Sequence, residues 1–154
     1  MPNYFAYGSN MSSAQMAERC PGASSLGAAR LDGFALSFDR WSDRRGGYVA
    51  DVLPSPGGSV WGVLWRVTSE HLVMLDRYEG VAAGAYRREF VRVQSASGHI
   101  DAVAYRVCEP ALPGSPPAAY LALILEGAKE HGLPAAYVAG IQAVASFGGI
   151  EGNR

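Results

Sequence analysis

Bulky apolar residues alternate with other residues along several short segments of the chain, a pattern typical of half-buried β-strands. The pattern is strongest over residues 60–67, where the bulky positions are Trp61, Val63, Trp65 and Val67. That spacing predicts a strand that carries both tryptophans on one face. Shorter apolar or aromatic runs predict further strands at residues 3–7, 31–38, 48–53, 86–93 and 100–107, with a hairpin at 95–98 between the last two.

Glycine, proline and charged residues mark the breaks between these strands. Residues 39–47 are charged and contain glycine, which predicts an exposed loop. The Pro-Ser-Pro-Gly-Gly run at residues 54–58 predicts a tight turn, because proline and glycine supply the backbone angles of turns. A proline-rich stretch at residues 110–117 predicts an extended linker.

Capping residues and glycines delimit two short helices in the first half of the chain. Ser12 or Ser13 can cap a helix with Met16 and Ala17 on its apolar face, ended by the Pro-Gly pair at residues 21–22. A second helix is predicted to begin at residue 68 or 69, because threonine and serine are good caps there, and to close at Gly80. Its leucines at 72 and 75 lie three apart and face the core together.

Two further helices are predicted after the proline-rich linker. The first covers residues 118–131, which are rich in Ala, Leu and Ile, and stops at Gly132. Pro134 suits the first turn of the next helix, which is predicted to run to about residue 146, with residues 148–154 as a loose tail. Short strands with inserted and appended helices predict an α+β fold around a closed or nearly closed antiparallel sheet.

Composition narrows the class of protein. The chain has 154 residues and no internal repeat, which fits one domain over residues 1–154. Thirteen basic and fourteen acidic residues leave a net charge of −1 with no basic run, so nucleic acid is not an expected partner and the substrate is expected to be small. We find no signal peptide and no membrane-spanning run, and the two cysteines at 20 and 108 form no CxxC motif. These features predict a soluble, cytoplasmic protein with reduced thiols.

The first candidate for chemistry is the end of the first strand, Tyr-Phe-Ala-Tyr-Gly-Ser-Asn at residues 4–10. A strand that breaks at Gly8, Ser9 and Asn10 can turn its backbone N–H groups outward into a nest that binds a carboxylate. Glycine supplies unusual backbone angles there, and serine and asparagine add side-chain hydrogen bonds. The alternative interpretation is a plain turn between a strand and a helix.

The second candidate is the segment from residue 75 to residue 86, which contains Asp76 and Glu79. On a helix these carboxylates share a face and can divide acid and base roles if their surroundings differ. Glu79 is the better candidate, because burial where the helix ends against glycine would raise its pKa. Carboxylates at such a position are otherwise solvated surface groups, and that alternative stays open on spacing alone.

Other residue types give weaker signals. Ser9 lies outside any GxSxG elbow, and no histidine stands near it in the sequence, which argues against a serine hydrolase. The three histidines show no metal-ligand spacing, so no metal is expected. Tyr105 shares a strand face with Val103 and Val107 and, from the pattern alone, is a core tyrosine.

Taken together, these motifs resemble the γ-glutamylcyclotransferase family. The motifs on which the resemblance rests are YFAYGSN at residues 4–10, the aromatic strand at 60–65, LDxxEG at 75–80, Gly-x-Tyr at 84–86, and GAKExGLP at 127–134. The resemblance spans roughly residues 4–146. It implies a small antiparallel or mixed β-barrel with flanking helices, an active cavity at one end and, as in many members, a homodimer.

The resemblance also implies an activity and the residues that carry it. A small-molecule γ-glutamyl substrate would cyclise to 5-oxoproline and release a free amine, with Glu79 as acid and base and no metal or other cofactor. The substrate pocket would be lined by Tyr4, Phe5, Ala6, Tyr7, Gly8, Ser9 and Tyr105.

The leaving amine is less well specified than the chemistry. Members specific for glutathione commonly have a bulky residue after YGS, so Asn10 favours the type that acts on γ-glutamyl amino acids. Residues 41–48 are shorter and richer in arginine than in animal members, and the C-terminal tail is short. Two rival functions remain. In the first, the same chemistry acts on a γ-glutamyl amine, or removes a γ-glutamyl protecting group from a natural-product intermediate. In the second, the protein is a non-catalytic γ-glutamyl-binding module.

Overall fold

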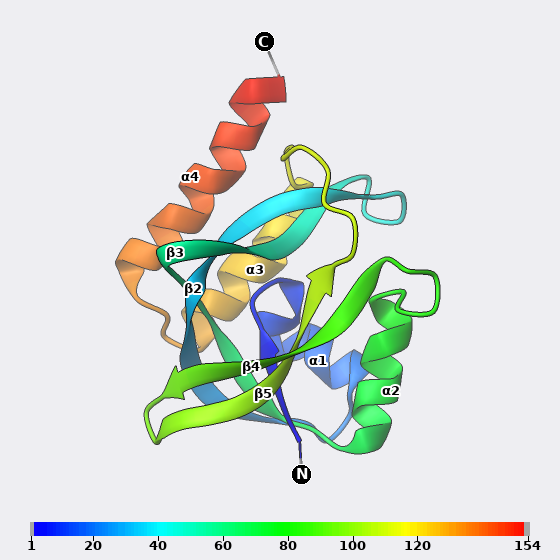
Figure 1. Cartoon of the computed structure of the whole chain (residues 1–154), viewed down its shortest axis with the longest axis vertical. Helices are drawn as coiled ribbons and strands as arrows, with labels where there is room; N and C mark the ends of the chain where they lie inside the picture. Colours follow the sequence, from blue (N-terminus) through cyan, green and yellow to red (C-terminus); the bar gives the residue numbers. More distant parts are fainter. Residues whose placement is uncertain (1, 153–154) are drawn as a thin grey trace.

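Five strands close into a barrel in the order β1-β3-β2-β4-β5, with helices packed around it (Figure 1). This computed structural model describes residues 2–152, with side chains described as far as residue 146. The strands are β1 (Asn3–Ala6), β2 (Ser24–Ser42), β3 (Gly47–Arg66), β4 (Tyr86–Ser95) and β5 (Gly98–Val107). The helices are the 3₁₀ turn η1 (Ser9–Met11), α1 (Ser13–Arg19), α2 (Ser69–Tyr78), α3 (Ala118–Glu130) and α4 (Ala135–Gly152). The predicted α+β fold with a mixed barrel is confirmed.

The short strand β1 closes the barrel. It pairs antiparallel with β3, with Asn3 opposite Arg66, and parallel with β5, with Tyr4 opposite Val103. This one parallel pairing among the described strands makes the barrel mixed. Gly62 of β3 permits the close approach, because a Cβ there would collide with the Ala6 carbonyl oxygen. The barrel therefore fixes where β1 ends and where the loop after it begins.

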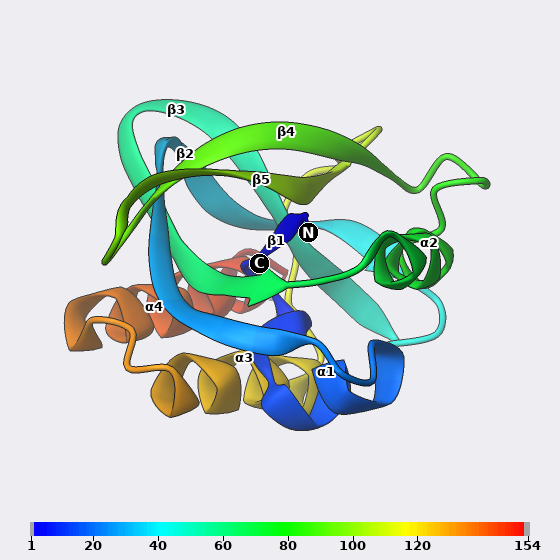
Figure 2. The same ribbon diagram turned by 90° about the horizontal axis from the view of Figure 1, so that it is seen from below.

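Helices cover one side of the barrel and press on that loop. In Figure 2, α1, α3 and α4 gather on one side, while α2 stands at the edge of the barrel. Gly127 of α3 lies so close to η1 that a Cβ would overlap the backbone of Met11, which is itself fully buried. The 3₁₀ turn after β1 is therefore clamped between the barrel and α3. No helix among the described residues is both long and apolar enough to cross a membrane.

The segment at residues 39–47 differs from its prediction as an exposed loop. Strand β2 continues to Ser42 and β3 starts at Gly47, so the connecting turn is only four residues long. The rings of Trp41 and Tyr48 pack edge to face across the hairpin, 5.5 Å apart, and Asp39 is completely buried. The charged residues suggested a loop, but β2 continues through them to Ser42 because it pairs with β3.

The Pro-Ser-Pro-Gly-Gly run is a bulge rather than a turn between strands. Strand β3 runs through it, and its pairing with β2 jumps from Pro54 opposite Phe34 to Ser59 opposite Asp32. Gly57 adopts a φ of +79°, which only glycine tolerates well. The extra residues bend the long hairpin, which a closed barrel needs.

The predicted helices occur at the expected positions, but two details of the predictions are wrong. Ser12 caps α1 and accepts a hydrogen bond from Gln15, and Met16 is buried, but Ala17 is exposed. The last helix extends to Gly152, past the predicted end near residue 146, so most of the expected loose tail is helical. The final two residues of that tail lie outside the described residues.

Two carboxyl groups, Asp39 and Asp51, lie buried side by side in the β2–β3 hairpin. Asp51 accepts a hydrogen bond from the Val107 N–H at 2.9 Å, but both carboxyl oxygens of Asp39 lack a donor among the described residues. Burial, and then the charge of Asp51, raises the pKa of Asp39. A proton on Asp39 lets it donate to its neighbour, because two ionised carboxylates only accept.

This pair predicts a loss of stability as pH rises. The folded protein binds the Asp39 proton more tightly than the unfolded chain does, so that stabilisation is complete in acid and is lost as pH rises through the folded pKa. Asp39→Asn mimics the protonated form. We expect its free energy of unfolding, measured in urea, to fall less than that of the wild type between about pH 5 and about pH 8.

Asp32→Asn is the control, because Asp32 is an exposed carboxylate with a lowered pKa, stabilised by hydrogen bonds from Arg30 and Ser59. It is ionised throughout this range, and its substitution should leave the pH dependence unchanged. Identical pH profiles for the wild type and Asp39→Asn would contradict the shared proton.

Candidate active site

A cavity of about 310 Å³ opens at the end of β1. Its walls come from the loop after β1, the tip of the β2–β3 hairpin, the end of α2, and single residues of α1, β4, β5 and α3. Glu79 lines this cavity together with Tyr7, Gly8 and Ser9. The two motifs that sequence analysis singled out are therefore brought to one place, although about 70 residues separate them in the chain.

The two ends of α2 and its buried face fix the position of Glu79. Thr68 accepts a hydrogen bond from the His71 N–H, and the His71 ring accepts one from the Thr68 N–H, so the helix start is capped reciprocally. Leu75 is completely buried and fixes the inner face of the helix. The helix ends at Glu79, whose N–H donates to the Leu75 carbonyl, and Gly80 follows with a φ of +64°. This exit turns the Glu79 side chain into the cavity wall.

The carboxyl group of Glu79 is desolvated without a direct partner. None of the described residues donates a hydrogen bond to it or forms an ion pair with it. Burial raises its pKa to about 7, although the positive charges of four arginines oppose that shift. These arginines are Arg19, Arg40, Arg44 and Arg45. A carboxyl group of this pKa both accepts and releases a proton near neutral pH.

Asn10 is the centre of a buried hydrogen-bond network behind the loop. Its Oδ1 accepts from Gln15 Nε2 at 2.8 Å and from Arg19 Nη1 at 3.2 Å, and its Nδ2 donates to the Tyr4 hydroxyl at 3.0 Å. The orientation of the amide follows from Arg19, because a guanidinium only donates. Trp65 Nε1 also donates to the Asn10 carbonyl at 3.1 Å. The loop is thus tied to β1, α1 and β3 at once.

Two of the tyrosines around the cavity have their hydroxyl protons committed to the protein. Tyr7 donates to the Tyr105 carbonyl, and Tyr86 donates to the Ala50 carbonyl at 2.7 Å. Burial raises the pKa of both hydroxyls, so they stay neutral. These residues shape the cavity wall and hold β1 and β4 to their neighbours.

Tyr4 and Tyr120 keep a free donor. The Tyr4 hydroxyl accepts from Asn10, and the Tyr120 hydroxyl accepts from the Ala50 N–H at 2.9 Å, while neither donates to any described residue. Burial raises the pKa of both well above that of ordinary tyrosine. Each hydroxyl therefore retains a proton that it can donate to a molecule in the cavity.

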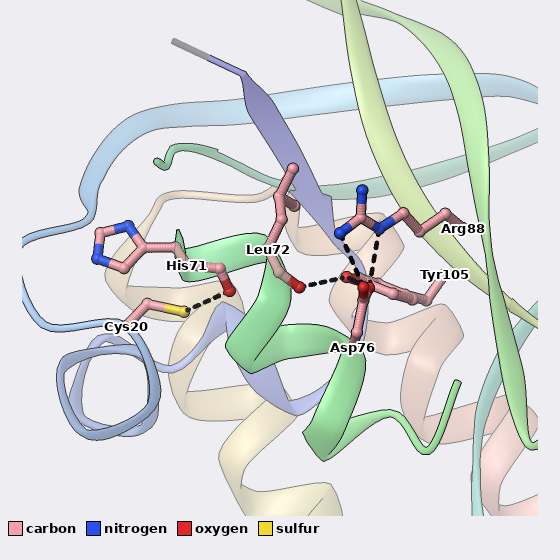
Figure 3. Close-up of polar contacts among 6 residues, drawn as sticks. All are labelled: Cys20, His71, Leu72, Asp76, Arg88 and Tyr105. Atoms are coloured by element: carbon pink, nitrogen blue, oxygen red, sulfur yellow. Dashed lines mark hydrogen bonds and ion pairs between the residues drawn. The ribbon is translucent and has the colours of Figure 1, made fainter. Parts of the chain in front are cut away.

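Tyr105 lines the cavity, but its hydroxyl group is hydrogen-bonded to Asp76 of α2 (Figure 3). It donates to Asp76 Oδ1 at 2.7 Å, and Arg88 donates to both oxygens of the same carboxylate at 2.8 Å. Although burial works against it, these bonds hold the pKa of Asp76 below its ordinary value. Asp76 is thus an anchor that fixes α2 against β4 and β5, and Glu79 is left as the carboxyl group without a protein partner in the cavity.

The predicted pocket residues divide into two groups. Tyr4, Tyr7, Gly8, Ser9, Glu79 and Tyr105 line the cavity. Phe5 and Ala6 do not: both are buried in the barrel wall, with the Phe5 ring against Gly62. The cavity also contains residues that sequence reasoning did not assign to the site, namely Arg19, Arg40, Arg44, Arg45, Tyr86 and Tyr120. The arginine-rich stretch at 41–48 was a signal for Arg44 and Arg45, and the Gly-x-Tyr motif at 84–86 was one for Tyr86.

Among the described residues, no group of His, Cys, Asp and Glu side chains is arranged to hold a metal ion. The cavity instead combines a carboxyl group whose pKa is about 7, neutral hydroxyl donors and guanidinium groups. This set can move a proton and bind anions.

Comparisons with known proteins show what this chain is similar to. Residues 59–141 match the AIG2-like family. The chain is 37% identical to a gamma-glutamylcyclotransferase of Mus musculus over 147 residues, which cover 92% of this chain and 77% of the mouse protein. A solved structure of a gamma-glutamyl cyclotransferase superposes with a TM-score of 0.84 at 36% identity, over 92% of this chain and 86% of that one. YkqA of Bacillus subtilis superposes with a TM-score of 0.83 at 28% identity, over 94% of this chain and 54% of that chain.

The network around Asn10 predicts a large effect of a small substitution. Asn10→Ala leaves Tyr4, Gln15 and Arg19 without their buried partner, and each unsatisfied polar group costs free energy. We expect the free energy of unfolding in urea to fall by about 1–3 kcal/mol. Asn3→Ala is the control, because the Asn3 amide makes a single long contact of 3.5 Å with the Asp101 carbonyl. Equal effects of the two substitutions would argue against Asn10 as the organiser of the loop.

Proposed function

The chain belongs to the γ-glutamylcyclotransferase family, and from this premise we propose that its cavity converts a γ-glutamyl amino acid to 5-oxoproline and a free amino acid. It is an enzyme with γ-glutamylcyclotransferase activity. The observation that carries the assignment of the site is the Glu79 carboxyl group, with a pKa of about 7 and no partner among the described residues, beside the Tyr7–Ser9 loop.

The reaction is an intramolecular acyl transfer. The α-amine of the glutamyl group attacks its own γ-carbonyl carbon, a five-membered lactam forms, and the bond to the neighbouring nitrogen breaks. Because nucleophile and electrophile belong to one molecule, the cavity has to fold the substrate and move protons. Correct orientation of such a reaction supplies roughly 7–11 kcal/mol of the barrier.

We assign both proton transfers to Glu79. The α-amine is an ammonium ion near neutral pH and attacks only after it has lost a proton. A carboxylate with a pKa of about 7 accepts that proton and then delivers it to the departing nitrogen. The attacking nitrogen loses a second proton as the lactam forms, and the departing nitrogen leaves as an ammonium ion. Two protons therefore pass in turn through Glu79 from one nitrogen to the other, and Glu79 is regenerated after each turnover.

Hydrogen-bond donors around the cavity support the charge that develops on the γ-carbonyl oxygen. The free hydroxyl protons of Tyr4 and Tyr120 are two candidates. The backbone N–H groups of Gly8 and Ser9 donate to no carbonyl of the described residues and are two more. Fixed donors of this kind stabilise an oxyanion without reorganisation during the reaction. Contact of Tyr105 with the substrate stays a prediction, since its hydroxyl proton is given to Asp76.

An unpartnered glutamate with a pKa of about 7 favours catalysis over mere binding of a γ-glutamyl group, because that pKa suits proton transfer near neutral pH. Removal of a γ-glutamyl protecting group would use the same chemistry on another amine. A cytoplasmic location and a homodimer stay predictions from the sequence.

Replacing the proposed proton carrier tests the mechanism directly. Glu79→Gln keeps the shape of the side chain but cannot accept a proton. We expect the rate of 5-oxoproline release, followed by mass spectrometry over a panel of γ-glutamyl compounds, to fall by at least about 10²-fold. Glu70→Gln removes an exposed carboxylate at the start of the same helix and should retain full activity. A Glu79→Gln variant that keeps more than about a tenth of the rate would refute the assignment.

The pKa of Glu79 also predicts the pH dependence. The base must be ionised, so kcat/KM should fall as pH decreases below about 7. Arg40→Gln removes a positive charge that lowers the pKa of Glu79, and in the structure Arg40 donates only one long hydrogen bond, to the Trp41 carbonyl. This variant should move the acidic limb of the profile to higher pH. A limb that stays in place or moves to lower pH would contradict Glu79 as the titrating group.

A further inference from the structure

A second cavity of about 300 Å³ adjoins the active cavity. The two share four lining residues, Arg19, Arg44, Arg45 and Tyr78. Glu79 and the Tyr7–Ser9 loop line only the first cavity. The second cavity therefore offers space, beyond the shared wall, for the leaving group of a substrate whose γ-carbonyl lies beside Glu79.

Three arginines form the shared wall without a carboxylate partner. Arg19 donates to Asn10 and lies over the Tyr78 ring, 4.4 Å from its centre. Arg45 donates to Gln15 Oε1 at 2.9 Å and lies over the Tyr120 ring. Arg44 makes no hydrogen bond or ion pair with any described residue. We call Arg19, Arg44 and Arg45 the arginine cluster.

The acidic groups near the arginine cluster do not neutralise it. Glu18 and Asp43 also line the cavities, but both are exposed to solvent, and Asp43 accepts a hydrogen bond from Trp41 Nε1 at 2.8 Å. Neither pairs with an arginine of the cluster. Burial, followed by the positive charges of Arg19 and Arg44, lowers the pKa of Arg45. Like charges are thus held together at a cost that a bound anion would offset.

We propose that the arginine cluster binds the leaving amino acid and selects one with an acidic side chain, so that γ-glutamyl-glutamate and γ-glutamyl-aspartate are preferred substrates. This inference rests on the proposed cyclisation. The α-carboxylate of any leaving amino acid supplies one negative charge for three guanidinium groups. A side-chain carboxylate supplies a second, and guanidinium groups bind carboxylates in well-defined geometry.

A matched pair of substrates tests the proposal. γ-Glutamyl-glutamate and γ-glutamyl-glutamine have nearly the same shape and differ by one charge. We expect the wild type to favour the glutamate compound in kcat/KM by roughly tenfold, about the value of one charge-assisted hydrogen bond. The readout is 5-oxoproline release, and the preference should shrink as ionic strength rises, because salt screens exposed charges.

Substitutions at Arg44 remove charge without breaking any hydrogen bond that the structure records. Arg44→Gln should lower the preference by roughly threefold and Arg44→Glu by more. The preference is measured as the ratio of kcat/KM for the two substrates, so an effect of the lost charge on Glu79, which both substrates share, cancels. Arg66→Gln is the control of equal charge change, because Arg66 is exposed at the far end of β3 and lines neither cavity. It should leave the preference intact.

The possible failures are distinguishable. Equal kcat/KM for the two substrates in the wild type, or a preference unaltered in both Arg44 variants, would overturn the arginine cluster as a selector and leave the cyclisation standing. A wild type that releases no 5-oxoproline from either compound, or from the wider γ-glutamyl panel, would overturn the proposed function and this inference with it.

Discussion

The Glu79 carboxyl group lines a polar cavity, half-buried and without a hydrogen-bond donor among the described residues, and the rest of the site is arranged around that condition. Burial disfavours its charged form, while four arginines that line the same cavity favour it. The balance of these two effects leaves the pKa of the group at about 7. A direct salt bridge would fix the carboxylate in its ionised form and remove it from proton transfer. The distance of the arginines from Glu79, rather than their number, therefore preserves its chemistry.

Asp76 shows how much the surroundings of a carboxylate decide. It lies one turn before Glu79 on α2, yet Arg88 and Tyr105 satisfy its oxygens and keep its pKa low. That bonding holds α2 against the barrel and so fixes the point where Glu79 enters the cavity. One helix and its C-terminal cap thus carry a structural carboxylate and a titratable one, because β4 and β5 present hydrogen-bond donors to Asp76 and no described residue donates to Glu79.

Recognition and proton transfer share the same residues. Asn10 ties Tyr4, a candidate donor to the substrate, to Arg19, which both lowers the pKa of Glu79 and belongs to the arginine cluster. Gln15 extends this network to Ser9 and Arg45. An anionic leaving group bound by the cluster would shield Glu79 from positive charge and make the carboxylate a stronger base. Binding of the leaving group and the readiness of the base are in this way physically coupled.

The sequence by itself determined the features that depend on near neighbours. The hairpin at 95–98, the caps at Ser12 and Thr68, the close of α2 at Gly80 and the two chemical motifs could all be predicted, because turns, caps and alternation act over a few residues. Only the tertiary structure decided what depends on distant partners. Pairing across the barrel extended β2 through Asp39, buried Phe5 and Ala6 in the wall, and brought Arg44 and Arg45 to the cavity. The pKa of Glu79 belongs to this second group, because burial and Coulomb interactions sum over residues that only the closed barrel brings together.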